Sequence, residues 1–245
     1  MTITASTPTE TAGSADPTRN HVRAAGIFYL VTFAASIPAL ILIQPVLNDP
    51  GFITGSGPDT RVLWGCFLDF INALAGIGSA VALFPVLKRR MESLALGFVT
   101  SRMLEAAVIM IGVVSLLAVV TLRQDVAGTA GTDPATLTTI GQALVAVRDW
   151  TFLFGPGFMP AFSALLLGSL LYRFRLVPRF IPAMGLVGAP LLLIVNILTV
   201  LGHNSQISVV SAVGTVLVAA WELTIGIYMI VKGFNTTAVT RSEAV

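Results

Sequence analysis

Charged residues are scarce in this sequence. Only 11% of its 245 residues are Asp, Glu, Lys or Arg, whereas 55% are hydrophobic, and the mean hydropathy is +0.88. A soluble domain carries about 25% charged residues, so this chain could not cover a globule with polar surface, and lipid must be its solvent. The net charge of only +2 is not a nucleic-acid signature, and we expect no nucleic-acid partner.

Residues that bind metals or carry out covalent catalysis are also few. Cys66 is the only cysteine, so no intrachain disulfide can form, and its apolar surroundings indicate a small buried hydrophobe. The two histidines, His21 and His203, are far apart in the chain and are predicted on opposite sides of a membrane. The sequence contains no zinc-type cysteine–histidine spacing, no G-x-S-x-G motif and no Walker lysine. We therefore expect no metal and no other cofactor.

Long apolar runs, by contrast, are abundant. Six of them reach the length of about 20 residues that a membrane-crossing helix needs, whereas a β-barrel would show shorter alternating segments. They cover residues 24–43, 62–87, 94–122, 150–172, 180–201 and 207–231. The predicted fold is therefore an all-α bundle of six transmembrane helices over residues 23–232. Aromatic residues near the run ends fit interfacial anchors, namely Tyr29, Trp64, Trp150 and Tyr172.

The segments outside these runs predict the orientation of the chain. Residues 1–22 lack the apolar region of a signal peptide and are predicted to form a disordered tail, and residues 233–245 form a second tail. Ten basic residues fall on the side of the two tails: Arg19, Arg23, Lys88, Arg89, Arg90, Arg173, Arg175, Arg179, Lys232 and Arg241. Only three fall on the other side: Arg61, Arg123 and Arg148. The positive-inside rule then predicts both termini in the cytoplasm.

A short amphipathic helix is predicted before the fourth span. Asp133 is suited to cap its N-terminus, and Pro134 fits the first helical position. Apolar residues follow at helical spacing, namely Leu137, Ile140, Leu144 and Val147. We expect this helix to lie on the outer surface, to cap the bundle, or to run straight into the fourth span. Residues 155–157 (Gly-Pro-Gly) and Pro160 are predicted to kink or break that span.

Four ionisable residues interrupt the apolar runs: Asp69, Arg102, Glu105 and Glu222. Each costs roughly 2.5–3.5 kcal/mol in hydrocarbon, so such residues usually face the bundle interior and have partners. Arg102 and Glu105 are three residues apart and share a helix face. Arg102 and Glu222 lie roughly 12 Å and 13 Å from the cytoplasmic ends of their helices. We therefore predict a buried Arg102–Glu105–Glu222 cluster, in which one carboxylate takes a proton unless Arg102 bridges both.

Other polar residues predict two further sites. Asp69 lies nearer the outer side, where Asn72, one turn along the helix, and Arg148 or Asp149 are its expected neighbours. A polar stripe on the fifth span contributes Asn196 to this secondary site. The second site is a set of basic residues that could bind anionic lipid heads, namely Lys88, Arg89, Arg90, Arg173, Arg175 and Arg179. Apart from the lipid bilayer no partner is indicated, and the sequence does not define an oligomeric state.

Several stretches resemble an uncharacterised bacterial membrane family, domain of unknown function 4386. They are residues 23–30 (RAAGIFYL), 84–90 (FPVLKRR), 94–105 with the R-x-x-E of Arg102 and Glu105, 176–179 (LVPR), and Trp221-Glu222 leading to 232–234 (KGF). The resemblance implies a bacterial multi-pass protein of the cytoplasmic (inner) membrane with no established activity. Arg102, Glu105 and Glu222 are matching positions, but the family supplies no role for them.

Two functions remain open, and a third is less favoured. The first is a protein that binds or transports a small molecule or a proton through a polar intramembrane cavity. The second is a structural or regulatory membrane subunit, in which the charged cluster only stabilises the bundle. An intramembrane enzyme is the least favoured, because a nucleophile–base pair or a metal-ligand set is lacking. Acid–base chemistry on a lipid by Glu105 and Glu222 would be its remaining form.

Overall fold

The computed structural model describes residues 17–55, 59–126, 133–205 and 208–235, and in these ranges every regular element is a helix. Six helices are long and apolar enough to cross a membrane, which confirms the predicted fold class. The helices are α1 (Pro17–Leu42), α2 (Gln44–Asn48), α3 (Thr60–Leu87), α4 (Glu92–Val126), α5 (Pro134–Phe152), α6 (Met159–Arg173), α7 (Phe180–Val200) and α8 (Val209–Val231). A 3-10 turn, η1, covers Phe52–Thr54, and a π-helical segment, η2, covers Leu153–Phe158.

The first helix begins earlier than the sequence predicted. Residues 17–22, assigned above to a disordered tail, form the first turns of α1. Val22 is fully buried there and joins these turns to the bundle, whereas Arg19, Asn20 and His21 are exposed. Pro17 suits a helix start because the first turn needs no backbone donor at that position. Residues 1–16 and 236–245, which hold the rest of the two predicted tails, lie outside the described residues.

The amphipathic helix predicted before the fourth span is continuous with that span. Together α5, η2 and α6 form one run of 40 residues. Asp133 caps it as predicted, accepting hydrogen bonds from the backbone amides of Ala135 and Thr136 and from the Thr136 hydroxyl. These bonds, the hydroxyl bond foremost, hold the pKa of Asp133 below its usual range.

The buried face of α5 only partly matches the predicted apolar stripe, of which Leu137 is buried and Leu144 packs against the core. Ile140 and Val147 are exposed, whereas Leu137, Gly141 and Arg148 are buried. The reason lies at Gly141, where a Cβ atom would stand 3.1 Å from Cγ2 of Ile53 in η1. A residue without a side chain therefore sets the contact face, which hydrophobicity alone does not reveal.

The predicted kink in the fourth span is the π-helical segment η2. Pro156 lacks a backbone N–H and removes one hydrogen bond from the helical ladder. The chain responds by widening over one turn instead of breaking, as π-helical segments do. Gly155 lies close to α4 here, because a Cβ atom on it would be 3.2 Å from Cγ1 of Val108.

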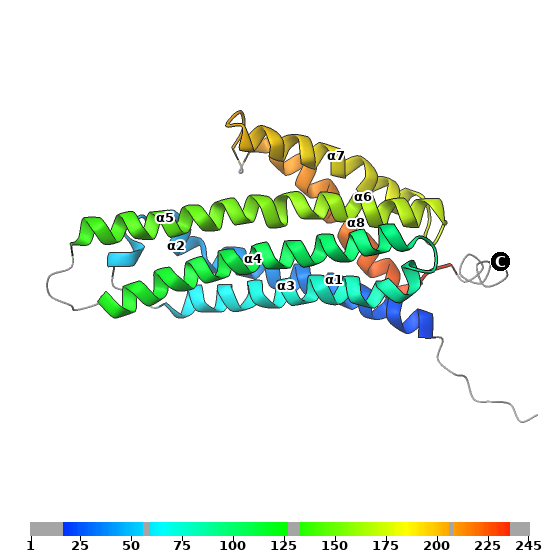
Figure 1. Ribbon diagram of the computed structural model, residues 1–245, viewed down its shortest axis with the longest axis horizontal. Helices are drawn as coiled ribbons and strands as arrows, with labels where there is room; N and C mark the ends of the chain where they lie inside the picture. Colours follow the sequence, from blue (N-terminus) through cyan, green and yellow to red (C-terminus); the bar gives the residue numbers. More distant parts are fainter. Residues whose placement is uncertain (1–16, 56–58, 127–132, 206–207, 236–245) are drawn as a thin grey trace, which may run out of the picture.

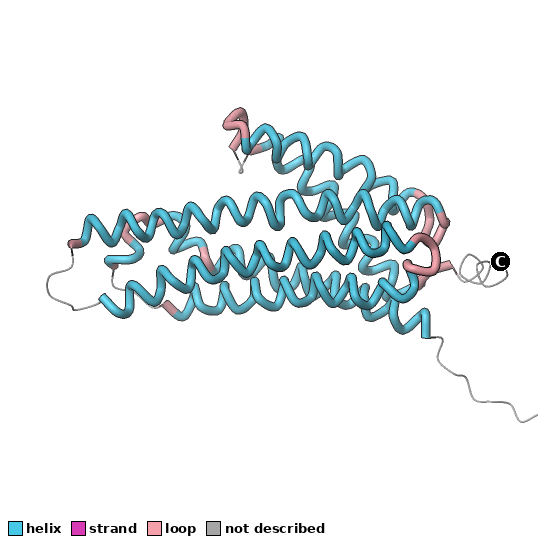
Figure 2. The backbone as a smooth tube through the Cα atoms, in the orientation of Figure 1, coloured by secondary structure: helices cyan, strands magenta, loops and turns pink. Residues whose placement is uncertain are grey.

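The six spans close into a ring (Figure 1). In that ring α1 packs against α3 and α8, α3 against α4, α4 against α5 and α6, α6 against α7, and α7 against α8. The start of α1, the end of α8 and the α3–α4 and α6–α7 loops lie at one end of the molecule, here called the terminal end. The opposite end, where α4 ends and α5 begins, is called the far end. Figure 2 shows loops at these two ends, whereas the α7–α8 loop stands apart at the top of the view.

Two spans are much longer than a bilayer requires. α4 has 35 residues and the α5–α6 run has 40, which gives about 52 Å and 60 Å at 1.5 Å per residue. The hydrocarbon layer is about 30 Å thick, so both helices extend beyond it at the far end. Near the end of α4, Arg123 links the extended part of this helix to the segment before α3. Its Nη1 lies 2.8 Å from Oδ1 of Asp59, and its guanidinium carbon lies 4.3 Å from the centre of the Phe52 ring.

Two glycines set the crossing of α1 and α8. A Cβ atom on Gly26 would lie 2.7 Å from the Gly226 carbonyl oxygen and 2.8 Å from Cγ1 of Ile230. By contrast, a Cβ atom on the buried Gly76 of α3 would meet no atom within 4 Å. Small residues of this kind let membrane helices approach closely.

We expect Gly26→Ala to destabilise the protein by about 1–3 kcal/mol, because the added methyl group forces α1 and α8 apart. Gly76→Ala, the matched control, should be neutral or stabilising by up to about 1 kcal/mol, because it lowers the entropy of the unfolded chain without a clash. Thermal unfolding of both variants in the same detergent measures the difference. Equal stability of the two variants would show that the Gly26–Gly226 contact is looser than described.

Candidate functional site: a polar cavity inside the helix ring

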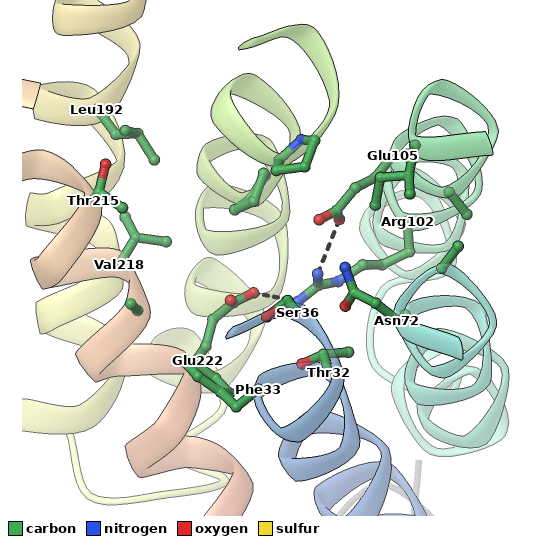
Figure 3. Close-up of a pocket in the computed structure, with 17 residues that line it drawn as sticks. Thr32, Phe33, Ser36, Asn72, Arg102, Glu105, Leu192, Thr215, Val218 and Glu222 are labelled. Carbon is green, nitrogen blue, oxygen red and sulfur yellow. Dashed lines mark hydrogen bonds and ion pairs between the residues drawn. The ribbon is translucent and has the colours of Figure 1, made fainter. Parts of the chain in front are cut away.

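An arginine bridges two carboxylates at the centre of the ring. Arg102 on α4 is 4% exposed, and its Nη1 donates a hydrogen bond of 2.9 Å to Oε2 of Glu105. Its Nη2 donates to Oε1 of Glu222 on α8, so the cluster links two helices that are not neighbours in the ring. Figure 3 shows both carboxylates pointing at the guanidinium, Glu222 from the left of the view and Glu105 from above. The three residues that the sequence suggested as a cluster therefore lie together.

Two aromatic rings hold the same guanidinium. The guanidinium carbon of Arg102 lies 5.0 Å from the ring centre of Tyr29 and 6.0 Å from that of Phe98. Both rings are fully buried, so these cation–π contacts are shielded from solvent. Sequence reasoning missed both residues and took Tyr29 for an interfacial anchor. Phe98 could have been found, because it lies one helical turn before Arg102 on the same helix face.

A cavity of about 170 Å³ borders this cluster. All six spans contribute to its wall, among them Ser36 of α1, Asn72 of α3, Pro156 of η2 and Thr215 of α8. This volume holds several water molecules, but it is smaller than the 300–1,000 Å³ typical of drug-sized ligands. Arg102, Glu105 and Glu222 are the charged residues among those that line it. When all three are ionised, the cavity wall carries a net charge of −1.

A second cavity of about 210 Å³ adjoins the first one toward the far end. The two share several lining residues, namely Ser36, Asn72, Ile109, Pro156 and Thr215. Arg148 of α5 and Asp69 of α3 form an ion pair on its wall, with 3.8 Å between Nη2 and Oδ2. That separation is too long for a direct hydrogen bond, so a water molecule or a solute group can join the pair. The Phe152 ring supports the Arg148 guanidinium at 4.7 Å.

Two residues assigned to the secondary site lie elsewhere. Asp149 lines a separate cavity at the far end, together with residues of α2 and η1. It follows Arg148 directly, and consecutive helical residues point about 100° apart, so only one of them can face Asp69. Asn196 lines neither cavity in the described structure and instead approaches Gly157 of η2. Asn72, in contrast, lines both cavities.

Several buried polar groups near this site have no hydrogen-bonding partner within the described ranges. They are Tyr29 Oη, Arg102 Nε, Asn196 Nδ2 and Trp221 Nε1. Buried polar groups are almost always paired in folded proteins, either with protein atoms or with water. Of these four residues only Arg102 lines the first cavity, and its guanidinium lies against the Tyr29 ring.

The chain folds as a multi-pass integral membrane protein of unestablished activity, with a charged cluster and cavities enclosed by its helices. It belongs to the family described as Domain of unknown function (DUF4386), whose model matches residues 24–233. This match confirms the resemblance seen in the sequence. No curated protein and no solved structure shows significant similarity to the chain. Among the described residues, no group of three His, Cys, Asp or Glu side chains could hold a metal ion.

Proposed function

We propose that this protein binds a small cation or a proton in its intramembrane cavity, as a transport-type membrane protein would. The observation that carries the proposal is the composition of the cavity wall, in which one buried guanidinium faces two carboxylates. With all three groups ionised, this site of net charge −1 attracts a positive charge strongly, because its low-dielectric surroundings screen little. An anion would meet repulsion from Glu105 and Glu222, so anionic solutes are disfavoured.

The depth of the site in the membrane suits a binding step during transport of a cation across it. Glu222 is nine residues from the end of α8, which places it about 13 Å from the terminal end, near the middle of the hydrocarbon layer. The Asp69–Arg148 pair lies farther along, because Asp69 is 18 residues from the end of α3, or about 27 Å. The two adjoining cavities thus form a polar route from the membrane centre toward the far end.

The membrane and the orientation are also proposed. The excess of basic residues at the terminal end favours a cytoplasmic location for both termini in a bacterial cytoplasmic membrane. A cavity of about 540 Å³ at this end is lined by Arg175, Arg179 and Lys232. It is suited to anionic lipid heads, as are the nearby Lys88, Arg89, Arg90 and Arg173.

The proposed function predicts that tetramethylammonium, a small cation used as a probe, stabilises the purified protein in lipid nanodiscs. A probe concentration of ten times Kd stabilises the folded state by about 1.4 kcal/mol, or about 3–6 °C in the unfolding midpoint. Glu222→Gln should abolish this shift, because the neutral amide leaves a cavity wall without net charge. If binding displaces a proton, proton release in weakly buffered solution will accompany the shift.

The matched control is Glu92→Gln, which removes the same charge from an exposed position at the start of α4. This variant should respond to the probe as the wild type does. An equal response of Glu222→Gln and the wild type would show that the cavity is not the binding site. An absence of any response to tetramethylammonium, methylammonium and choline in the wild type would count against cation binding.

A further inference from the structure

The face of α1 that points into the ring becomes steadily more exposed toward the far end. Val22, Gly26 and Tyr29 on this face are buried. Phe33 and Ser36 come next and are half-buried, and Leu40 is exposed. These six residues are spaced three or four apart and therefore form a single helix face. This face therefore loses its contact with α8 toward the far end, whereas Ala39 and Ile43, on another face of the chain here, stay buried next to α3.

The facing side of α8 shows the same gradient. Gly226, close to the Gly26 contact, is buried, and Glu222 and Ala219 are half-buried. Thr215 and Ala212, the next residues outward on this face, are exposed. The two helices therefore diverge from their glycine contact and leave a wedge between them, open toward the far end. Figure 1 shows the α7–α8 hairpin leaning away from α5 in the same half of the molecule.

The wedge has a polar apex and apolar edges. Its apex is the first cavity, with Glu222, Thr32 and Ser36 among the lining residues. Ile37 and Leu40 of α1 line the second cavity and are 57% and 40% exposed. The opposite wall of this cavity is polar, with Asp69, Asn72 and Arg148. The wedge therefore has a polar inner wall and, at its α1 edge, exposed apolar side chains that face lipid chains.

The cavity is closed toward the terminal end. Tyr29, Phe98 and Trp221 are fully buried around the cluster, and the larger apolar core of the molecule continues below them. Leu83, Leu87, Leu167, Leu170 and Leu171 of this core are also fully buried. A ligand therefore reaches Glu222 from the far half of the membrane and not from the terminal end.

We propose that the site receives an amphipathic cation sideways from the lipid leaflet at the far end, between α1 and α8. The cationic head lies against Glu222 and Glu105, and a linear apolar tail lies along Ile37 and Leu40 toward the acyl chains. This proposal rests on the proposed function and names its substrate class and its route of entry. The head group is small because the apex cavity is small, and the tail needs no enclosed volume because the wedge is open to lipid.

The test uses a dodecyltrimethylammonium analogue with a photoreactive diazirine in mid-chain, with the protein in lipid nanodiscs. Illumination and peptide mapping should place adducts on the facing sides of α1 and α8, around Leu40 and Thr215. Glu222→Gln should reduce these adducts by about tenfold or more, because a buried charge-assisted contact is lost. Thr215→Trp should reduce them similarly by filling the wedge.

Val216→Trp is the matched control, because it adds a tryptophan at the neighbouring position of α8. Val216 is 63% exposed and lines neither cavity. This variant should leave the adducts in the wedge unchanged. Even labelling of all lipid-facing helices, with no Glu222 dependence, would overturn the proposal. Equal labelling by an analogue with a phosphocholine head would also overturn it, since the occupant would then be a membrane lipid and not a cation.

The two proposals fail in different ways. If tetramethylammonium binds in a Glu222-dependent manner but the wedge is not labelled, lateral entry is wrong and cation binding stands. If neither probe depends on Glu222, both proposals are wrong. Excess tetramethylammonium should compete with the labelled analogue, because both heads use the same apex.

Discussion

Arg102→Met is expected to destabilise the protein by about 3–5 kcal/mol, the cost of leaving buried carboxylates without their partner. Glu105 and Glu222 would face each other across a cavity that offers no second basic residue among those lining it. Methionine keeps much of the apolar stem, so the effect reports the charge more than the packing. Thermal unfolding in nanodiscs measures it, together with the yield of folded protein.

The rescue experiment separates a structural from a functional role. A triple variant, Arg102→Met with Glu105→Gln and Glu222→Gln, removes all three charges and should recover most of the lost stability. If the cluster only stabilises the bundle, the triple variant regains the stability of the wild type, and no response to tetramethylammonium is lost. If the cluster binds a cation, the triple variant is folded but no longer responds to tetramethylammonium. A fully stable Arg102→Met single variant would contradict the burial of the cluster itself.

Arg148→Met is expected to destabilise the protein by about 2–3 kcal/mol, because it leaves the buried Asp69 carboxylate unpaired. The effect should be smaller than at Arg102, since the 3.8 Å separation shows a looser pair and one carboxylate is involved instead of two. The variant also lacks the contact between the Arg148 guanidinium and the Phe152 ring, which adds to the loss of stability.

A double-mutant cycle with Asp69→Asn isolates the pair from these other effects. The double variant should be more stable than the sum of the single effects predicts, by about 0.5–3 kcal/mol. The cycle is measured by thermal unfolding under the same conditions as for Arg102. Strict additivity would mean that Asp69 and Arg148 do not interact and that each is held by other groups.

The sequence was sufficient for those parts of the structure that depend on position along a helix. Run length predicted the six spans, and the spacing of Arg102 and Glu105 put both on one face. Depth alone then brought Glu222 to the level of Arg102, because each residue adds the same rise along the helix axis. Asp133 and Pro134 marked the start of α5 through the chemistry of helix ends.

Other features depend on how the helices are rotated and tilted, and hydropathy says little about either. Tyr29 is a buried partner of Arg102, and Asn196 faces η2 instead of Asp69. The rotation of each helix about its axis decides such contacts. In a membrane, side-chain packing sets this rotation, because lipid is as apolar as the helix faces and hydrophobicity does not favour one face over another. The sequence by itself determined the number of spans and the shared depth of Arg102, Glu105 and Glu222, but not how far α4 and the α5–α6 run extend. Only the tertiary structure decided that α1 and α8 meet at Gly26 and Gly226 and then diverge, because the contact of two small residues fixes the point where two helices cross.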